Sequence, residues 1–538
     1  IPTTRRACVP GVAGQAGLSK HALGPRLTRL AVGALLAGTL LAGTTPATGT
    51  PAAAAPPLSG SQARALAAPL PGRPGDFRLV AGPSLAVLVD RLEAALPKQG
   101  LSALMARADR EAGRDGACGT TGIYGPDLTP HHRVCWDDTD ATSSEWIPQS
   151  ITGVSDAQED EDWGSSDADP LVVGSYDAEN PGRSDYVWGR ADCLRATASA
   201  ACEEKGVRVS LFHRATGKYR HVLLVWPYTD SRGRVSFDAL HAREGMCTGT
   251  VTESCKAQNG THAGGMVWYG NHLFVADTEN GLRVFDLRTI LDLDPDGDAA
   301  VDDPTPDGLV SNVRDPRRIG RQGAVWYGFG HRYVMPQVAT LNFTAPRPPG
   351  ETDAYQCYAT ARPKASYISL DRTGADHLLL GEYCSTDGGD SPGRVGTYPM
   401  AAVTAAVEGA AGTVADADSA YGLPTGPTLD GEALWQKIQG VTRYEGTWYF
   451  HRGNGTDHGR LLQATTATVD GASRLVGNPK ALRSSIGPED LYLAHGRGDG
   501  LPARLWSLSE HAPSVCAACE REMYGYDMSA VTRAFGGR

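Results

Sequence analysis

The chain has 538 residues, of which 41% are hydrophobic and 21% are charged, as in a soluble globular protein, and its formal net charge at pH 7 is −11. This charge balance excludes nucleic acid as the expected partner, because phosphate groups are bound by clusters of Lys and Arg. An acidic surface favours solubility and suits cations or neutral sugars.

The first 55 residues are expected to be a secretory signal peptide. Cationic side chains such as Arg5, Arg6 and Lys20 precede an apolar run at residues 30–43, and small residues at 53–55 follow it. The apolar run has about 14 residues, fewer than the roughly 20 of a spanning helix, so a retained membrane anchor is the less favoured alternative. We expect an extracellular protein, secreted through a cleaved signal peptide, with no stable membrane anchor.

The cysteines indicate disulfide bonds. Of 11 cysteines, Cys8 lies in the signal segment, and the other ten fall in neighbouring couples. Exported proteins keep such couples oxidised, and pairing along the chain is the simplest connectivity, although sequence alone leaves it open. The predicted disulfide cysteines are Cys118 and Cys135, Cys193 and Cys202, Cys247 and Cys255, Cys357 and Cys384, and Cys516 and Cys519. The alternative for the last couple, a C-x-x-C spacing, is a redox or zinc motif.

Composition divides the rest of the chain into three parts. Residues 56–80 are rich in Pro and Ala and are expected to form a linker. Residues 81–140 are expected to form a helical N-terminal extension, because apolar residues recur at helical spacing on either side of Pro97 and Gly100. Residues 141–538 change to short strands separated by Gly, Asp and Asn turns, which predicts an all-β domain.

Two kinds of unit recur in this all-β part. The first has two strands across a tight turn, at residues 266–278, 324–336 and 441–453. The second has a strand that runs into a short helix or turn, at residues 282–293, 394–407 and 522–535. Repeated four-stranded antiparallel units of this kind predict a β-propeller. Its blade number is expected to be five, with six or seven as alternatives, and the strand at 522–531 is expected to close the ring by pairing with the first blade.

The segment LFVADTENGLRVFDL at residues 273–287 resembles a blade of bacterial propellers of the YVTN or LVIVD-repeat kind. The resemblance covers residues 141–538. It implies a secreted bacterial β-propeller protein, a class with no settled function, and it implies the architecture far more than any activity.

A propeller brings the beginnings of its innermost strands to a central channel. On our alignment of the repeats, each innermost strand begins with a polar residue that precedes a small one. The five polar residues are expected to converge there as a ligand-binding ring: Gln149, His262, Gln322, Gln439 and Glu489. Such a ring can hold a cation or a polar ligand. The alternative is that these groups only satisfy one another and water.

An aspartate-rich loop is the strongest candidate for a metal site, and the metal that it suits is calcium. Alternating carboxylates and a glycine at the turn are typical of calcium-binding loops. The candidate ligands are Asp292, Asp294, Asp296, Asp298 and Asp303, with Asp302 beside them. The loop departs from the EF-hand pattern because Asp303 stands where that pattern has a bidentate Glu. The alternative is a solvated acidic loop between blades.

Other candidates are weaker. Asp160, Asp162 and Trp163 lie in an acidic run after the first inner strand, and such runs are usually solvated loops. Three tryptophans recur at positions that we interpret as equivalent, which indicates core packing: Trp268, Trp326 and Trp448. The sequence has no G-x-S-x-G, H-E-x-x-H or G-x-x-x-x-G-K-[ST] motif.

Three functional hypotheses follow. The favoured one is a secreted propeller that binds a polar ligand, a carbohydrate or a metabolite, on its channel face. The first alternative is a polysaccharide-active hydrolase or lyase, in which Glu489 is the candidate acid and His262 the candidate base. The second alternative is an extracellular scaffold whose partners are proteins. The sequence leaves open whether the protein is an enzyme.

Overall fold

The computed structural model describes residues 72–157, 170–178, 205–240, 261–301, 305–349, 351, 355–385, 391–426, 428–429, 432–496 and 502–536. The chain divides into two compact units, residues 1–57 and 58–538, and every described residue belongs to the second. The predicted signal peptide and several predicted residues lie outside the described part: Asp160, Asp162, Trp163, Cys193, Cys202, Cys247, Cys255, Asp302 and Asp303. Within the described part, no helix is long and apolar enough to cross a membrane.

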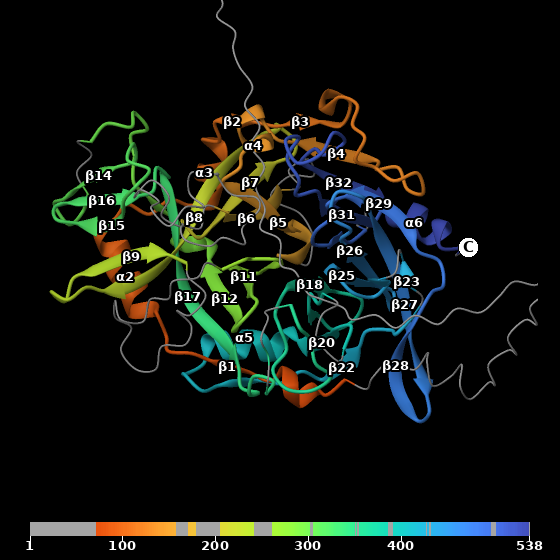
Figure 1. Ribbon diagram of the computed structural model, residues 1–538. Helices are drawn as coiled ribbons and strands as arrows, with labels where there is room; N and C mark the ends of the chain where they lie inside the picture. The colour runs from red at the N-terminus through yellow and green to blue at the C-terminus, as the bar shows by residue number, and fades with distance from the viewer. Residues whose placement is uncertain are drawn as a thin grey trace, which may run out of the picture. The chain divides into compact units, whose positions relative to one another are not determined.

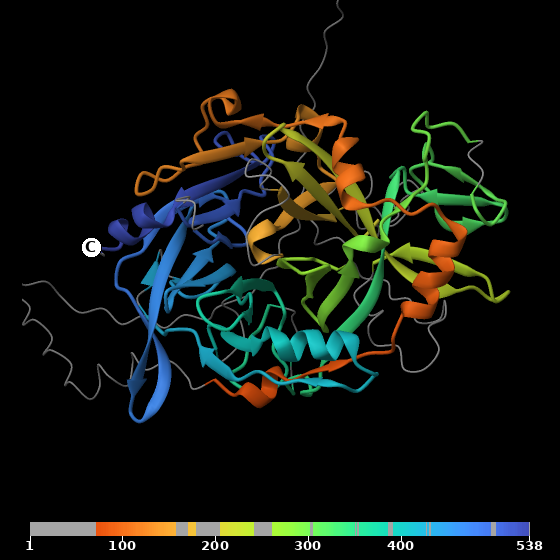
Figure 2. The same cartoon turned by 180° about the vertical axis from the view of Figure 1, so that it is seen from behind.

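The main strands form five groups in chain order, each built of neighbouring antiparallel strands (Figures 1 and 2). The first two groups are joined into one larger sheet, because β17 of the second pairs in parallel with β8 of the first. The first two sheets are β5 (Trp146–Gly153), β6 (Pro170–Asp177), β7 (Val207–His213) and β8 (Lys218–Thr229), followed by β10 (Met266–Tyr269), β11 (His272–Asp277), β12 (Gly281–Asp286) and β17 (Tyr333–Phe343). The third is β18 (Tyr367–Asp371), β19 (His377–Gly381), β20 (Arg394–Pro399) and β22 (Ser419–Gly422).

The last two sheets complete the series. One contains β25 (Ile438–Tyr444), β26 (Thr447–Arg452), β27 (His458–Val469), β28 (Ala472–Gly477) and β29 (Leu482–Ile486). The other contains β30 (Tyr492–Ala494), β31 (Arg504–Leu508), β32 (Glu522–Asp527), β4 (His132–Cys135) and β3 (Gly113–Arg114). Each of the first strands β5, β10, β18, β25 and β30 contacts the next, and β30 contacts β5. This closed cycle of first strands makes the domain a β-propeller. The blade number of the whole chain stays a prediction, because parts of it lie outside the described residues.

The core lies between neighbouring sheets. Both faces of β5, β6, β18 and β12 are buried, as expected where each sheet packs against one sheet on either side. The largest fully buried side chains include Trp226, Trp326, Trp435, Trp448 and Trp506. At about 25 cal/mol per Å² of apolar surface, this packing is the main stabilising contribution to the fold.

The second recurring unit of the sequence is the third strand of a sheet followed by a short helix. β12 leads into η7 (Leu287–Thr289), β20 into α5 (Met400–Glu408) and β32 into α6 (Met528–Ala534). The helices cover apolar edges: Val403 of α5 and Val531 of α6 are both fully buried. The repeat in the sequence therefore reflects a repeated place in the architecture.

The first recurring unit is uniform only in part. Residues 266–278 and 441–453 are the hairpins β10–β11 and β25–β26. Residues 324–336 are not a hairpin, because β16 (Val325–Gly328) pairs with β14 (Val310–Asn312) and β15 (Ile319–Gln322), whereas β17 belongs to the β10 sheet. The three tryptophans are buried but not equivalent: Trp268 precedes the turn of its hairpin, Trp448 follows it, and Trp326 lies outside the five sheets.

The ring closes differently from our expectation. β32 does not pair with the first sheet, because it is itself the third strand of the last one. β4, from the segment predicted as a helical extension, supplies the next strand by pairing with β32. An unpaired strand edge exposes backbone hydrogen-bonding groups, and β4 satisfies them.

The predicted extension contains helices and strands together. α2 (Ala86–Ala95) and α3 (Leu101–Ala106) are separated by the stretch with Pro97 and Gly100, as expected, and bury Leu92 and Leu104. β1 (Leu79–Ala81) pairs with β17, and β2 (Arg110–Glu111) pairs with β8.

The other described elements of the domain are short. They are η1 (Pro74–Phe77), η2 (Asp115–Cys118), α4 (Asp138–Ala141), η3 (Val154–Asp156), β9 (Val235–Ala239), β13 (Leu291–Asp292), β21 (Val414–Ala415), β23 (Thr428–Leu429) and β24 (Glu432–Ala433).

Three of the predicted disulfides lie in the described part, and all three form between the expected partners. They are Cys118–Cys135, Cys357–Cys384 and Cys516–Cys519. The C-x-x-C couple is therefore a disulfide in this structure. Cross-links of this kind stabilise a fold mainly by restricting the unfolded chain.

Candidate functional site

Two glutamates meet at the beginning of β30. Glu489 lies just before β30, and Glu510 lies just after its neighbour β31. The backbone N–H of Glu489 donates to the carbonyl of Leu508 at 3.1 Å, and that of Glu510 donates to the carbonyl of Gly487 at 2.9 Å. This antiparallel pairing places the two glutamates diagonally on one face, where side chains come into contact. Glu489 is 1% exposed, whereas the Glu510 side chain is 21% exposed and reaches solvent.

Two glutamine amides complete this site, which we call the glutamate pair site (Gln149, Gln439, Glu489 and Glu510). Nε2 of Gln149, on β5, donates to Oε2 of Glu510 at 2.9 Å. Nε2 of Gln439, on β25, donates to Oε1 of Glu489 at 2.8 Å. Three residues of the predicted ring are therefore gathered, and Glu510, which the sequence did not single out, joins them. Its place after β31, rather than before a first strand, is the reason that our alignment missed it.

Burial and charge repulsion set the protonation of Glu489. Burial, followed by the neighbouring carboxyl of Glu510, raises the pKa of Glu489 well above its usual value. A buried carboxyl beside another carboxyl is disfavoured in its charged form. Glu489 therefore keeps its proton to a higher pH than an ordinary glutamate does.

His511 and Arg521 lie beside Glu510 in its own loop. Nδ1 of His511 lies 3.5 Å from Oε1 of Glu510. Arg521 is held in place by hydrogen bonds from its Nε to the Glu510 carbonyl at 2.6 Å and from its Nη1 to the Ser143 carbonyl at 2.7 Å. Burial lowers the pKa of Arg521 to about 10, which leaves its guanidinium positive at neutral pH.

The next residue, Asp490, has a structural role. Its Oδ2 accepts the backbone N–H groups of Ile151 at 3.2 Å and Met266 at 3.3 Å, so it joins the first strands β5 and β10 to β30. Burial raises the pKa of Asp490 well above its usual value. Gly440 on β25 leaves room for this segment, because a Cβ there would lie 2.8 Å from the backbone carbon of Asp490.

The other two members of the predicted ring lie apart from these contacts. His262 is exposed, and its ring stacks on Tyr176 of β6 at 4.3 Å between centroids. Gln322 is not at the beginning of a first strand. It is exposed on β15, and its Nε2 donates to the Ile319 carbonyl at 3.2 Å. The polar-then-small pair that we aligned there is Gln322, the last residue of β15, and Gly323, in the turn before β16.

The aspartate loop divides into two groups. Carboxylate oxygens of Asp294, Asp296 and Asp298 lie within 4.8 Å of one another, and Gly297 makes the turn between them with a φ of 83°. Asp292 does not join them, because it is buried and bound by Arg332, whose Nε and Nη2 donate to its two oxygens at 2.8 and 2.9 Å. Three of the five predicted ligands are thus close together, and Asp303 lies outside the described residues.

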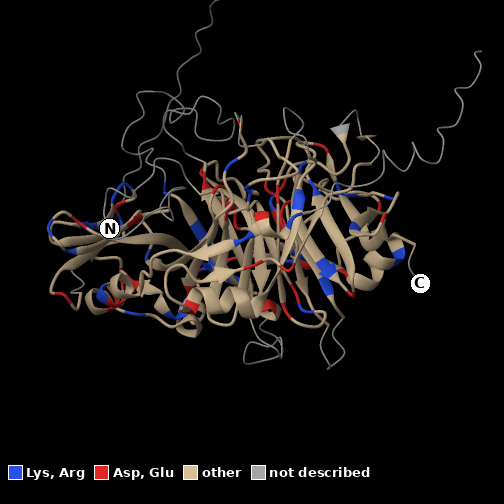
Figure 3. Cartoon of the chain, turned by 90° about the horizontal axis from the view of Figure 1, so that it is seen from below, with Lys and Arg blue, Asp and Glu red and all other residues tan. Residues whose placement is uncertain are grey.

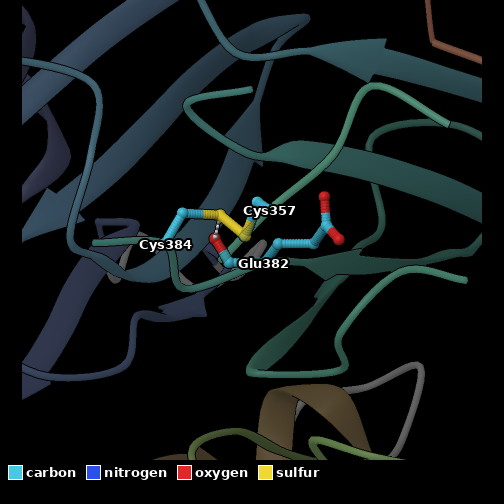
Figure 4. A group of neighbouring side chains, drawn as sticks. All are labelled: Cys357, Glu382 and Cys384. Carbon is cyan, nitrogen blue, oxygen red and sulfur yellow. Dashed lines mark hydrogen bonds between the residues drawn. A yellow bond between two sulfur atoms is a disulfide. The ribbon is translucent and has the colours of Figure 1, made fainter. Parts of the chain in front are cut away.

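A second group with metal-ligand chemistry is instead a cross-link. Cys357, Glu382 and Cys384 lie together, but their sulfur atoms form a disulfide (Figure 4). The Glu382 carboxylate is neutralised by Arg394, whose Nε and Nη2 donate to it at 2.8 and 3.0 Å. Neither the sulfurs nor this carboxylate is available for a metal ion in this state.

A serine, a histidine and an aspartate also lie in hydrogen-bond sequence. Oγ of Ser210 lies 2.8 Å from Nδ1 of His221, and Nε2 of His221 lies 3.1 Å from Oδ2 of Asp140. Ser210 is fully buried, and Asp140 also binds Arg110 and Arg208. Burial, then the charge of Arg208, lowers the pKa of His221 to about 4. With no exposed serine, this group is a buried polar network between β7 and β8 rather than a nucleophilic centre.

Comparison with known proteins gives the following. No protein-family model and no curated protein matches the chain, so its resemblance to YVTN or LVIVD repeats stays a prediction. A GH43_1 enzyme from Xanthomonas citri aligns at 10% identity over 72% of this chain and 89% of that chain, with a TM-score of 0.28. CoXyl43, a GH43 β-xylosidase/α-arabinofuranosidase from a compost microbial metagenome, solved with xylotriose in a calcium-free form, aligns at 9% identity over 75% and 94%, with a TM-score of 0.30.

A putative oxidoreductase (glucose dehydrogenase) from Thermus thermophilus aligns at 12% identity over 72% of this chain and 98% of that chain, with a TM-score of 0.26. All these TM-scores are below 0.5, so the fold rests on the strand pairing and the site on its own residues. Together they define the class: a disulfide-bonded β-propeller in which a buried glutamate, Glu489, lies beside a partly exposed one, Glu510, where its first strands begin.

Proposed function

We propose that this protein is a secreted β-propeller that binds a carbohydrate at the glutamate pair site. The observation that carries the proposal is the pair of neighbouring glutamates, Glu489 and Glu510, each of which accepts a hydrogen bond from a glutamine amide. Hydroxyl groups of a sugar both donate and accept hydrogen bonds, and this set of groups offers acceptors and donors together. Glu510 is the member that reaches solvent, so it is the residue expected to touch the ligand, with Glu489 and the amides holding it in position.

A second candidate function, a carbohydrate-active hydrolase or lyase, is favoured by the raised pKa of Glu489. A carboxyl with a raised pKa suits a general acid, and the adjacent Glu510 suits a base. Two features count against it. Each carboxyl already has a partner within the protein, because Gln149 donates to Glu510 and Gln439 donates to Glu489. Glu489 is also almost fully buried and cannot reach a substrate directly.

The test uses the full chain, produced by secretion, and a panel that includes xylotriose, cellotriose and maltotriose. Binding is measured by titration calorimetry, and soluble products are scored in the same samples. Glu510→Gln keeps the shape of the side chain but removes its charge, and is expected to weaken binding at least about tenfold, or about 1.4 kcal/mol. Glu520→Gln is the matched control, because it lies in the same loop and only its backbone carbonyl is bonded within the described residues.

Binding without products, lost in Glu510→Gln and kept in Glu520→Gln, supports the binding function. Products that vanish in Glu489→Gln or Glu510→Gln support the enzyme instead, and a base at His262 would then be tested by His262→Ala. An absence of binding and products with every sugar would contradict both and favour the interaction scaffold.

The proposal also includes the location of the protein and a bound metal ion. The three disulfides in the described part support an extracellular location, because thiols are oxidised outside the cell. We propose calcium as a structural ion at Asp294, Asp296 and Asp298, a hard cation that suits clustered carboxylates. Calcium is then expected to raise the melting temperature of the protein, and Asp296→Asn to remove that increase. An equal increase in the melting temperature of the variant would exclude this loop as the calcium site.

A further inference from the structure

An arginine-lined hollow lies on the small sheet of β14, β15 and β16, outside the five sheets. Its volume is about 600 Å³, and it is lined by the loop between β14 and β15, including Arg314, Arg317 and Arg318 with the single acid Asp315. β15 contacts β9, which joins this sheet to the β5 sheet (Figure 1). The hollow therefore belongs to a different part of the domain from the first strands and the glutamate pair site.

The loop is held in place by its neighbours. The backbone N–H of Phe329 donates to the Arg318 carbonyl at 2.8 Å, and the Asp315 carboxylate accepts the backbone N–H of Arg317 at 2.9 Å. Nη1 of Arg318 donates to the hydroxyl of Tyr327 at 3.1 Å, and its guanidinium lies over that ring at 5.3 Å. Arg318 is thereby oriented before any ligand arrives, which reduces the entropy lost on binding.

The charges of this loop are only partly balanced. Arg318 Nε lies 3.5 Å from Asp315, and Arg314 Nη2 reaches a backbone carbonyl of Asp298 at 3.5 Å. The guanidinium of Arg317 makes no hydrogen bond or ion pair with any described residue, and it is exposed. Along the ribbon, positions of Lys and Arg are interspersed with positions of Asp and Glu (Figure 3). Three arginines against one aspartate therefore stand out in a chain whose net charge is −11.

The guanidinium groups of the hollow indicate which class of ligand it binds. Guanidinium groups bind carboxylate, sulfate and phosphate through paired N–H donors. A single small anion is bound only weakly at so exposed a site. A polymer with repeated charges binds more tightly, because one of its charged groups can replace another in the hollow. Nucleic acid needs more positive charge than this hollow offers within an acidic protein. We propose that the hollow binds the carboxylate or sulfate groups of an acidic polysaccharide. It is a second site, which does not depend on the proposed function of the glutamate pair site.

The test is affinity electrophoresis of the full chain in gels that contain one polymer each. Polygalacturonate presents carboxylates, dextran sulfate presents sulfates, and dextran is the neutral control; double-stranded DNA tests the competing class. The double variant Arg317→Ala/Arg318→Ala is expected to bind the preferred acidic polymer about tenfold more weakly, and Arg317→Lys to fall between it and the natural protein. Arg232→Ala is the matched control, because this exposed arginine lies in the β8–β9 turn and, among the described residues, makes only a backbone hydrogen bond.

The proposal is supported if an acidic polymer retards the natural protein and Arg232→Ala, retards the double variant less, and loses its effect with added salt. Comparison of the two acidic polymers distinguishes carboxylate from sulfate. No retardation of the natural protein, equal loss in Arg232→Ala, or stronger binding of DNA would overturn it. Calorimetry with the neutral trisaccharides keeps the two sites distinguishable, because the arginine variants leave the glutamate pair site intact.

Discussion

Arg133 on β4 binds the carboxylate of Glu522 on β32 across 389 positions of sequence. Nε of Arg133 donates to Oε2 of Glu522 at 2.9 Å, Nη2 donates to Oε1, and the hydroxyl of Tyr124 donates to Oε2. Glu522 is fully buried. This ion pair fastens the strand that closes the ring, because β4 and β32 are neighbours in the last sheet.

Replacing Arg133 with Ala is expected to lower the free energy of unfolding by about 3–5 kcal/mol, because it leaves a buried carboxylate without its partner. Urea unfolding at pH 7 measures the change. The control is Arg78→Ala, whose ion pair with Asp416 is half exposed on both sides and is worth at most about 1 kcal/mol. Equal losses in the two variants would show that ring closure does not depend on this pair.

The raised pKa of Glu489 makes the stability of the fold depend on pH. Because its folded-state pKa is raised above the usual 4.5, the folded chain keeps a proton that the unfolded chain has lost. The resulting contribution is complete below about 4.5 and is lost as the pH rises toward the folded-state pKa. Glu489→Gln cannot ionise, so its melting temperature relative to the natural protein is expected to increase from pH 4.5 to pH 8. A difference that stays constant, as expected for Glu520→Gln, would contradict a raised pKa at Glu489.

The buried network of Ser210, His221 and Asp140 is expected to matter for stability and not for chemistry. Ser210→Ala removes one hydrogen bond and is expected to cost about 1 kcal/mol. Asp140→Asn weakens ion pairs with Arg110 and Arg208 and is expected to cost about 3–5 kcal/mol. Both are measured by urea unfolding, with sugar binding and product formation followed in parallel. Loss of either function in a folded Ser210→Ala protein would show that this serine reaches a substrate after all.

Close approach of two first strands is expected to make Gly440 sensitive to substitution. A Cβ at this position would lie 2.7 Å from the backbone nitrogen of Leu491 and 2.8 Å from the carbonyl carbon of Asp490, so the backbone of β25 or β30 must shift. Gly440→Ala is expected to cost about 1–3 kcal/mol. Gly75→Ala is the control, because a Cβ there meets no atom within 4 Å, and it is expected to change stability by less than about 0.5 kcal/mol. Thermal unfolding compares the two, and equal melting temperatures would contradict the close approach.

Some features of the fold could be predicted from sequence because they depend on local patterns. The strand-to-helix units at β12, β20 and β32, the helices on either side of Pro97, and the described disulfide couples all involve residues close together in the chain. Turn residues and apolar spacing determine such features locally. Their repetition was enough to indicate a β-propeller.

The candidate site could be predicted only in part. Gln149, Gln439 and Glu489 each lie within or just before a first strand, so an alignment of repeats could find them. Gln322 shared the same local pattern but lies on β15, because its flanking strands pair with each other and with β14 instead of joining a sheet of the ring. A polar residue before a small one does not specify which strand will lie beside it.

Sequence patterns alone were sufficient for the class of fold, the local strand and helix units and the described cysteine couples. Packing in three dimensions was needed to show that Glu510 meets Glu489, that Arg133 closes the ring onto Glu522, and that Ser210, His221 and Asp140 are sealed inside. The physical reason is distance along the chain. Local backbone preferences fix turns and strands, whereas the burial of a charge and the choice of its partner depend on which distant strands pack together.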